Sequence, residues 1–145
     1  GEGPARPWFE KALPNGIFVG HQEKADLARA LASADLFLNP SITETFGNVT
    51  LEAMACALPV VAAAATGATN LVRDGETGTL AEPRDIPALA AAVAAYAANP
   101  ELRRQHGQAG LAFAKTQDWD VINGAVLKTY ARAIERRERL HRIKG

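Results

Sequence analysis

The sequence is poor in the residue types that mark several classes of protein. It has 145 residues with a single cysteine, Cys56, and three histidines. A single cysteine excludes an internal disulfide, and the few thiols and imidazoles disfavour a Cys/His metal cluster. We therefore expect no bound metal or other cofactor. Because a free cysteine behaves as a small apolar residue, we expect the Cys56 thiol to be buried.

The chain also lacks an excess of charge of either sign and any long apolar run. Its 16 basic side chains balance its 16 acidic ones, which argues against a nucleic-acid binder that depends on phosphate contacts. The alanine-rich stretch 88–98 is too short to span a bilayer, and no signal peptide pattern opens the sequence. We therefore expect a cytoplasmic protein with one globular domain and one core.

Apolar runs and helical periodicities alternate along the chain. The pattern predicts strands at 17–19, 36–39, 58–63 and 79–80, the last at an edge, and helices at 8–13, 24–34, from 46 onward, 85–98, 100–114 and about 119–140. We expect a turn at 66–70 and a tight turn or hairpin at 74–78. Such alternation predicts an α/β fold with a parallel sheet.

The most informative stretch runs from Pro40 to Ala55, where a strand leads through a polar loop into a helix. Thr43 and Thr45 are candidate caps for this helix, and Gly47 lets a ligand approach the backbone. The first turn of a helix presents N–H groups without helical partners, and the peptide dipoles favour negative charge there. We therefore expect a phosphate or diphosphate at this point.

Two carboxylates, Glu44 and Glu52, bracket the expected anion site. A carboxylate repels a phosphate, so each is better suited to accept hydrogen bonds from hydroxyl groups at opposite ends of a diphosphate. On one helix they would be about 12 Å apart, farther than the roughly 5–10 Å of paired glycosidase carboxylates. The spacing favours a nucleotide-sugar site over a glycosidase pair.

These residues resemble a known family. Glu44, seven intervening residues and Glu52 are similar to the donor-binding signature of the retaining glycosyltransferases of group 1 (family 4), which have the two-domain GT-B fold. Further similarity to this family occurs at 53–61, 71–78 and 99–103. The resemblance implies that residues 1–145 form the C-terminal, nucleotide-sugar-binding half of a longer enzyme, with a Rossmann-like, three-layer α/β/α fold.

The resemblance also implies a role for each residue of the signature. Glu44 is the candidate catalytic residue and holds hydroxyls of the donor sugar, while Glu52 binds the ribose hydroxyls. Transfer retains the anomeric configuration and needs no metal ion. The remaining backbone contacts to the sugar and phosphate are assigned to Phe46, Gly47, Asn48 and Val49.

Residues Gly20, His21 and Gln22 follow the first predicted strand, at a position where open parallel sheets bind ligands. They resemble family positions near the nucleobase, which they would contact through backbone atoms. The alternative is that His21 is an ordinary loop residue, and the sequence leaves both possibilities open.

The first residues, Gly1 to Pro4, resemble the turn after the second strand of the family's C-terminal half. The sheet is therefore expected to be incomplete at its N-terminus and the chain to be truncated, without the Arg and Lys that clamp the donor diphosphate in this family. The last helix would cross to an N-terminal Rossmann-like domain. Without that partner, an apolar face should lie uncovered at Trp119, Ile122, Val126, Tyr130 and Ile134.

Together these features predict transfer of a hexose from a nucleotide diphosphate sugar to a glycan or lipid acceptor, with the isolated chain inactive. The sequence of residues 47–50 resembles that of GDP-mannose-dependent members of the family, although a UDP-sugar is an alternative donor. The alternative is a non-catalytic nucleotide-binding or interaction module. The basic tail 128–144 is either a solvated helix end or a weak contact with the inner face of an anionic membrane.

Overall fold

The structure is a computed structural model that describes residues 2–144, with the side chains of 138 and 140–144 excluded. Gly1, the first residue of the Gly1–Pro4 motif, and Gly145 lie outside the described residues, and so do several side chains of the basic tail. The element order is α1 (Arg6–Ala12), α2 (Lys24–Ala32), β1 (Phe37–Asn39), α3 (Asn48–Ala55), β2 (Val60–Ala63), α4 (Thr66–Leu71), β3 (Gly78–Ala81), α5 (Ile86–Ala98), α6 (Pro100–Lys115) and α7 (Trp119–Lys144).

The three strands form one parallel sheet in the order β1-β2-β3. Phe37 aligns with Val60, and Val60 in turn aligns with Gly78. Parallel strands joined by helices confirm the predicted Rossmann-like α/β class. The strand predicted at 79–80 is β3, which lies at one edge of this sheet.

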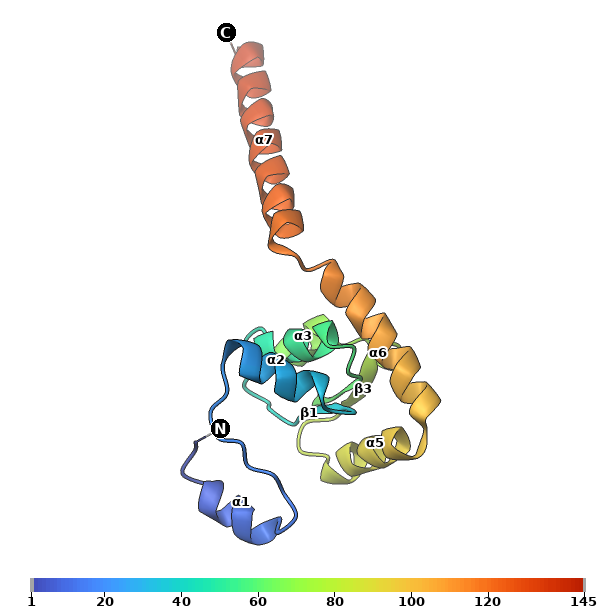
Figure 1. Cartoon of the computed structure of the whole chain (residues 1–145). Coiled ribbons are helices and arrows are strands. Elements are labelled where there is room, and N and C mark those ends of the chain that lie inside the picture. The colour runs from blue at the N-terminus through green and yellow to red at the C-terminus, as the bar shows by residue number, and fades with distance from the viewer. Residues whose placement is uncertain (1, 145) are drawn as a thin grey trace.

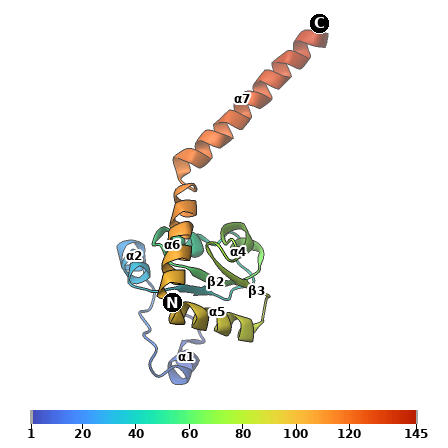
Figure 2. The ribbon, with the colours of Figure 1, turned by 90° about the vertical axis from the view of Figure 1, so that its right-hand side faces the viewer.

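Helices cover both faces of the sheet (Figure 2). On one face, Val60 packs with Met54 of α3 and Leu71 of α4. On the other, Val61 packs with Tyr96 and other residues of α5. This alternation arises because successive side chains of a strand point to opposite faces. All four residues of β2 are buried, as expected for a central strand with helices on both sides.

The strand predicted at Ile17–Val19 is not formed. This segment is irregular, and the Ile17 side chain is 89% exposed. Its carbonyls bond to side chains instead: the Arg6 guanidinium donates to Phe18 O at 3.3 Å, and Gln22 Nε2 donates to Val19 O at 2.6 Å. A strand needs a neighbouring strand for its hydrogen bonds, and none lies alongside these residues within the described chain.

Of the two turns predicted near β3, one is wrong and one is confirmed. Residues 66–70 form most of helix α4 rather than a turn, because Thr69 N and Val72 N bond back to Ala65 O and Ala68 O. Residues 74–78 form the predicted tight turn and not the alternative hairpin: Gly75 N donates to Gly78 O at 2.9 Å, and Thr77 N donates to Arg73 O at 3.0 Å. This turn delivers β3 parallel to β2, with Asp74 Oδ1 accepting from Leu80 N at 2.9 Å.

The helical C-terminal half follows the predicted pattern closely. Asp85 caps α5 by accepting from Ala88 N, and Asn99 caps α6 by accepting from Leu102 N. Helix α7 then projects away from the sheet (Figure 1). No helix in the described part of the chain is both long and apolar enough to cross a bilayer.

Candidate functional site

The loop between β1 and α3 lies at the carboxyl end of β1, where open parallel sheets bind ligands. Asn39, the last residue of β1, ties the two elements together. Its Nδ2 donates to the Thr50 hydroxyl at 3.2 Å, and its Oδ1 accepts from Ser41 N at 3.1 Å. Thr50 is fully buried, so this link fixes the start of α3 relative to the sheet.

Gly47 is the N-cap of α3, and neither Thr43 nor Thr45 caps the helix as expected. The φ of Gly47 is 93°, which lies in the left-handed region where a residue with a side chain is strained. No side chain among those that the structure describes caps the first-turn N–H groups of α3. These groups and the positive end of the helix dipole therefore suit an anion.

The two signature carboxylates lie on different sides of α3. Glu44 is half-buried in the loop, and Gly67 of α4 lies directly against it. Glu52 is exposed on α3 and faces α2. A ligand that reaches both must therefore extend across the N-terminal part of α3.

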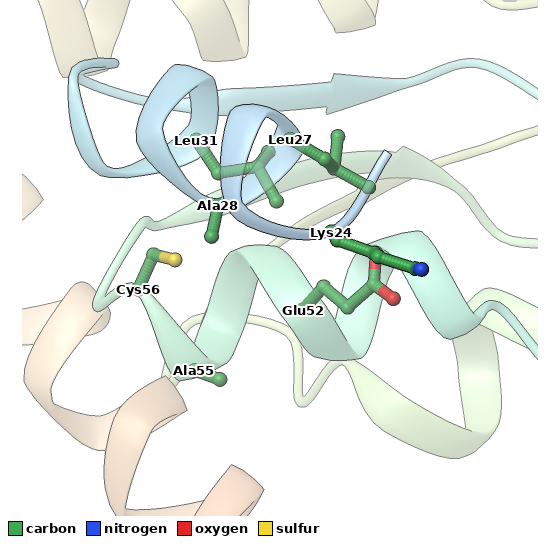
Figure 3. A pocket seen from close by; sticks show the side chains of 7 residues that line it. All are labelled: Lys24, Leu27, Ala28, Leu31, Glu52, Ala55 and Cys56. Carbon is green, nitrogen blue, oxygen red and sulfur yellow. The ribbon is translucent and has the colours of Figure 1, made fainter. Parts of the chain in front are cut away.

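Glu52 lies at one end of a pocket of about 280 Å³ between α2 and α3 (Figure 3). Lys24, the first residue of α2, lies at the same end, and Cys56 lies at the other. Apolar side chains from both helices form the rest of the wall: Leu27, Ala28, Leu31 and Ala55. The Cys56 thiol is half-buried rather than buried as predicted, because it lines this opening.

Two other signature residues face a separate cleft of about 370 Å³ at the α6–α7 junction. Phe46 and Asn48 line it together with Gln117, Trp119 and Ile122. The Phe46 side chain is 48% exposed. The start of α7 therefore forms part of the surroundings of the signature loop. Val49, the next residue of α3, is half-buried.

The residues proposed near the nucleobase lie in the loop that precedes α2. His21 is exposed and pairs with Glu23 at 2.9 Å, while Gln22 bonds to backbone carbonyls in its own loop. Gly20 has a φ of 74°. None of the three lines the α2–α3 pocket, although Lys24 follows them closely in sequence. Their contact with a base stays a prediction.

Sequence reasoning missed Lys24 and Asn39, and it treated Thr66–Gly67 as part of a turn without predicting their contact with Glu44. Lys24 could have been suspected from its position just after the predicted base-contact loop. Asn39 and Thr66–Gly67 gave no comparable signal, because their partners lie 11 and 22 residues away in the chain. Within residues 2–144, no group of three or more His, Cys, Asp or Glu side chains is arranged to hold a metal ion.

Comparison with known proteins gives consistent matches. A family model described as "Glycosyl transferases group 1" matches residues 1–99. Phosphatidyl-myo-inositol mannosyltransferase from Mycobacterium leprae is 38% identical over 114 residues, which cover 78% of this chain and 30% of that protein. This chain thus spans only a minor part of the length of such relatives.

Solved structures show the same similarity in three dimensions. Sucrose-phosphate synthase from Thermosynechococcus elongatus has a TM-score of 0.79 and 31% identity, covering 90% of this chain and 34% of that one. HepE from Anabaena, in complex with UDP-glucose, has a TM-score of 0.65 and 33% identity, covering 75% of this chain and 30% of that one.

Proposed function

Because this chain belongs to the glycosyl transferases of group 1, we propose that it is the donor-binding half of a retaining glycosyltransferase. In this proposal the enzyme moves a hexose from a nucleotide diphosphate sugar to a glycan or lipid acceptor. An N-terminal Rossmann-like domain supplies the acceptor site and further contacts to the donor. No metal ion takes part, and the isolated chain is inactive.

The observation that carries this proposal is the arrangement around the start of α3. An N-terminus without a side-chain cap lies between two glutamates on different sides of the helix. The N–H groups from Phe46 to Val49 would meet the sugar and the diphosphate. Glu44 would hold sugar hydroxyls and Glu52 ribose hydroxyls, because an ionised carboxylate only accepts hydrogen bonds.

The same arrangement suggests how transfer would be accelerated. When the sugar leaves, negative charge grows on the departing nucleoside diphosphate. Preorganised N–H donors and the positive end of a helix dipole stabilise that charge more in the transition state than in the ground state. Gly47 contributes by bringing the backbone close to the ligand without a side chain in between.

The donor base is the least determined part of the proposal. The sequence of residues 47–50 resembles that of GDP-mannose-dependent members and so favours GDP-mannose. The UDP-glucose bound to the similar Anabaena protein favours a uridine nucleotide instead. Lys24 at the pocket mouth is a hydrogen-bond donor only, and both uracil and guanine present carbonyl acceptors to such a group. Titration must therefore include both nucleotides.

Calorimetric titration with UDP, GDP and ADP, alone and in the Glu52→Ala variant, tests the donor site. We expect selective binding of UDP or GDP that weakens about 10-fold to 150-fold in Glu52→Ala, because the ribose loses a charged acceptor. Glu82→Ala, which removes an exposed glutamate from the loop before α5, serves as the charge-matched control. Equal affinities for Glu52→Ala and the unmodified chain would remove Glu52 from the site.

The alternative, a non-catalytic nucleotide-binding module, predicts the same titration result. The two are separated by testing sugar transfer in a longer protein that joins these residues to the proposed N-terminal domain. Hydrolysis or transfer from UDP-glucose or GDP-mannose would support the enzyme. Binding without any turnover in that longer protein would support the module.

A further inference from the structure

Helix α4 contacts the Glu44 loop more closely than the sequence suggested. The backbone carbonyl of Glu44 accepts two hydrogen bonds, from the Thr66 hydroxyl at 2.8 Å and from Gly67 N at 3.0 Å. Both donors belong to the first turn of α4. A carbonyl oxygen has two lone pairs, so these two bonds satisfy it fully.

The contact is close enough to require glycine at position 67. A Cβ atom there would lie 2.8 Å from Glu44 Cγ, 2.9 Å from Glu44 O and 3.1 Å from the Phe46 carbonyl carbon. Two of these three atoms belong to the backbone, so they could not move aside without moving the loop. Gly67 is buried in this contact.

The far end of α4 supports the other side of the same loop. Leu71, the last residue of α4, has its Cδ1 3.1 Å from the point where a Gly47 Cβ would lie. Leu71 is itself buried in the core with Val60 of β2. Helix α4 therefore lies along the loop from Glu44 to Gly47.

The start of α4 is in turn tied to the sheet. Ala64 N donates to Ala81 O of β3 at 2.7 Å, and Ala65 N donates to Ala63 O of β2 at 2.7 Å. Ala65 directly precedes Thr66 in the chain. A functional side chain is held most accurately when rigid elements support it, and here the support leads from the sheet through α4 to Glu44.

We infer that Thr66 and Gly67 are positioning residues that set where Glu44 lies relative to the donor sugar. This inference rests on the proposed function, since it assigns Glu44 to sugar hydroxyls. It predicts that loss of the Thr66 hydroxyl affects the sugar part of the donor and spares the nucleotide part, which Glu52 and the α2–α3 pocket would bind on the other side of α3.

The test compares the affinities of UDP and UDP-glucose in matched variants. Thr66→Val removes the hydroxyl, Thr66→Ser keeps it, and Gly67→Ala inserts a methyl group against Glu44. The control is Thr69→Val, because the Thr69 hydroxyl bonds only to carbonyls of its own helix region, Ala65 O and Thr66 O.

For Thr66→Val and Gly67→Ala we expect the affinity for UDP-glucose to fall about threefold to tenfold while the affinity for UDP stays within twofold. Thr66→Ser and Thr69→Val should leave both affinities unchanged. Unchanged UDP-glucose binding in Thr66→Val, or an equal loss for both ligands, would overturn the inference while leaving the donor site intact. If the unmodified chain bound neither ligand, the proposed function and this inference would both be overturned.

Amide hydrogen exchange on the ligand-free chain gives a second readout. In Thr66→Val we expect faster exchange at residues 44–48 and at Gly67, whose N–H bonds to Glu44 O, with no change in β2. Exchange that is unaltered in the loop would show that the hydroxyl does not hold Glu44 and would overturn the inference directly.

Discussion

Strand β2 and helix α7 are both rich in apolar residues, but they differ completely in burial. All four side chains of β2 are buried between helices, whereas Trp119 and Tyr130 of α7 are 75% and 62% exposed. The sequence analysis predicted a strand in the first region and an uncovered apolar helix face in the second. The comparison shows that apolar content alone does not decide burial, because a face is buried only where another element packs against it.

The largest expected effect comes from the contact between α6 and the end of α3. A Cβ at Gly107 of α6 would lie 2.0 Å from Ala57 O, a backbone atom that cannot yield locally. Gly107→Ala should therefore lower the free energy of unfolding by about 4–5 kcal/mol or more, as measured by urea unfolding.

The matched control is Gly124→Ala in α7, where an added Cβ meets no atom within 4 Å. Alanine is the better helix former, so this variant should raise the helical signal in circular dichroism without destabilising the core. If Gly107→Ala were as stable as Gly124→Ala, the close packing of α6 on α3 would be wrong.

A cavity in the core should cost nearly as much as this backbone clash. Met54 of α3 is completely buried against the sheet, so Met54→Ala should lower the free energy of unfolding by about 2–5 kcal/mol. Trp119→Ala removes a larger but exposed side chain from α7 and should change the free energy of unfolding by no more than about 0.5 kcal/mol. Similar losses in both variants would show that α7 packs on the domain in solution.

Removing the buried hydroxyl of Tyr96 should have a smaller effect on the free energy of unfolding, and this effect should depend on pH. The Tyr96 hydroxyl lies 2.7 Å from His106 Nδ1 and 3.2 Å from the Thr79 hydroxyl. Tyr96→Phe should lower the free energy of unfolding by about 1–3 kcal/mol at neutral pH, because His106 is buried and loses its partner.

The same tyrosine predicts the behaviour of the chain in alkali. Burial raises the pKa of Tyr96, with a smaller contribution from the charge of Asp74. A raised pKa favours the neutral phenol in the folded state. This contribution to stability is therefore complete below the ordinary tyrosine pKa of about 10 and disappears as the pH rises through the raised value. Unfolding measured from pH 8 upward should show this loss in the unmodified chain and in Tyr130→Phe, but not in Tyr96→Phe.

The smallest effect is expected at the segment that failed to form a strand. Ile17 is 89% exposed, so Ile17→Thr should change the free energy of unfolding by less than about 0.5 kcal/mol. The measurement is urea unfolding beside Val61→Thr, in the buried central strand, which should be clearly destabilised. A large loss in Ile17→Thr would indicate that the segment is packed in solution.

The local signals of the sequence predicted most elements of the fold. Asp85 and Asn99 predict the starts of α5 and α6, because a side-chain cap bonds to a backbone N–H only three positions later. The failures have a common origin. Whether Ile17–Val19 forms a strand depends on a neighbouring strand, and whether 66–70 forms a helix depends on packing between the sheet and the Glu44 loop.

For the candidate site, the sequence alone determined the loop, the helix that follows it and the two glutamates within them. Spacing along a helix is a local property, so it could be read without the fold. Only the tertiary structure decided that Glu44 and Glu52 lie on different sides of α3, that Lys24 shares a pocket with Glu52, and that α4 holds the Glu44 carbonyl. The last two relations join residues more than 20 positions apart in the chain, and packing rather than local preference brings them together.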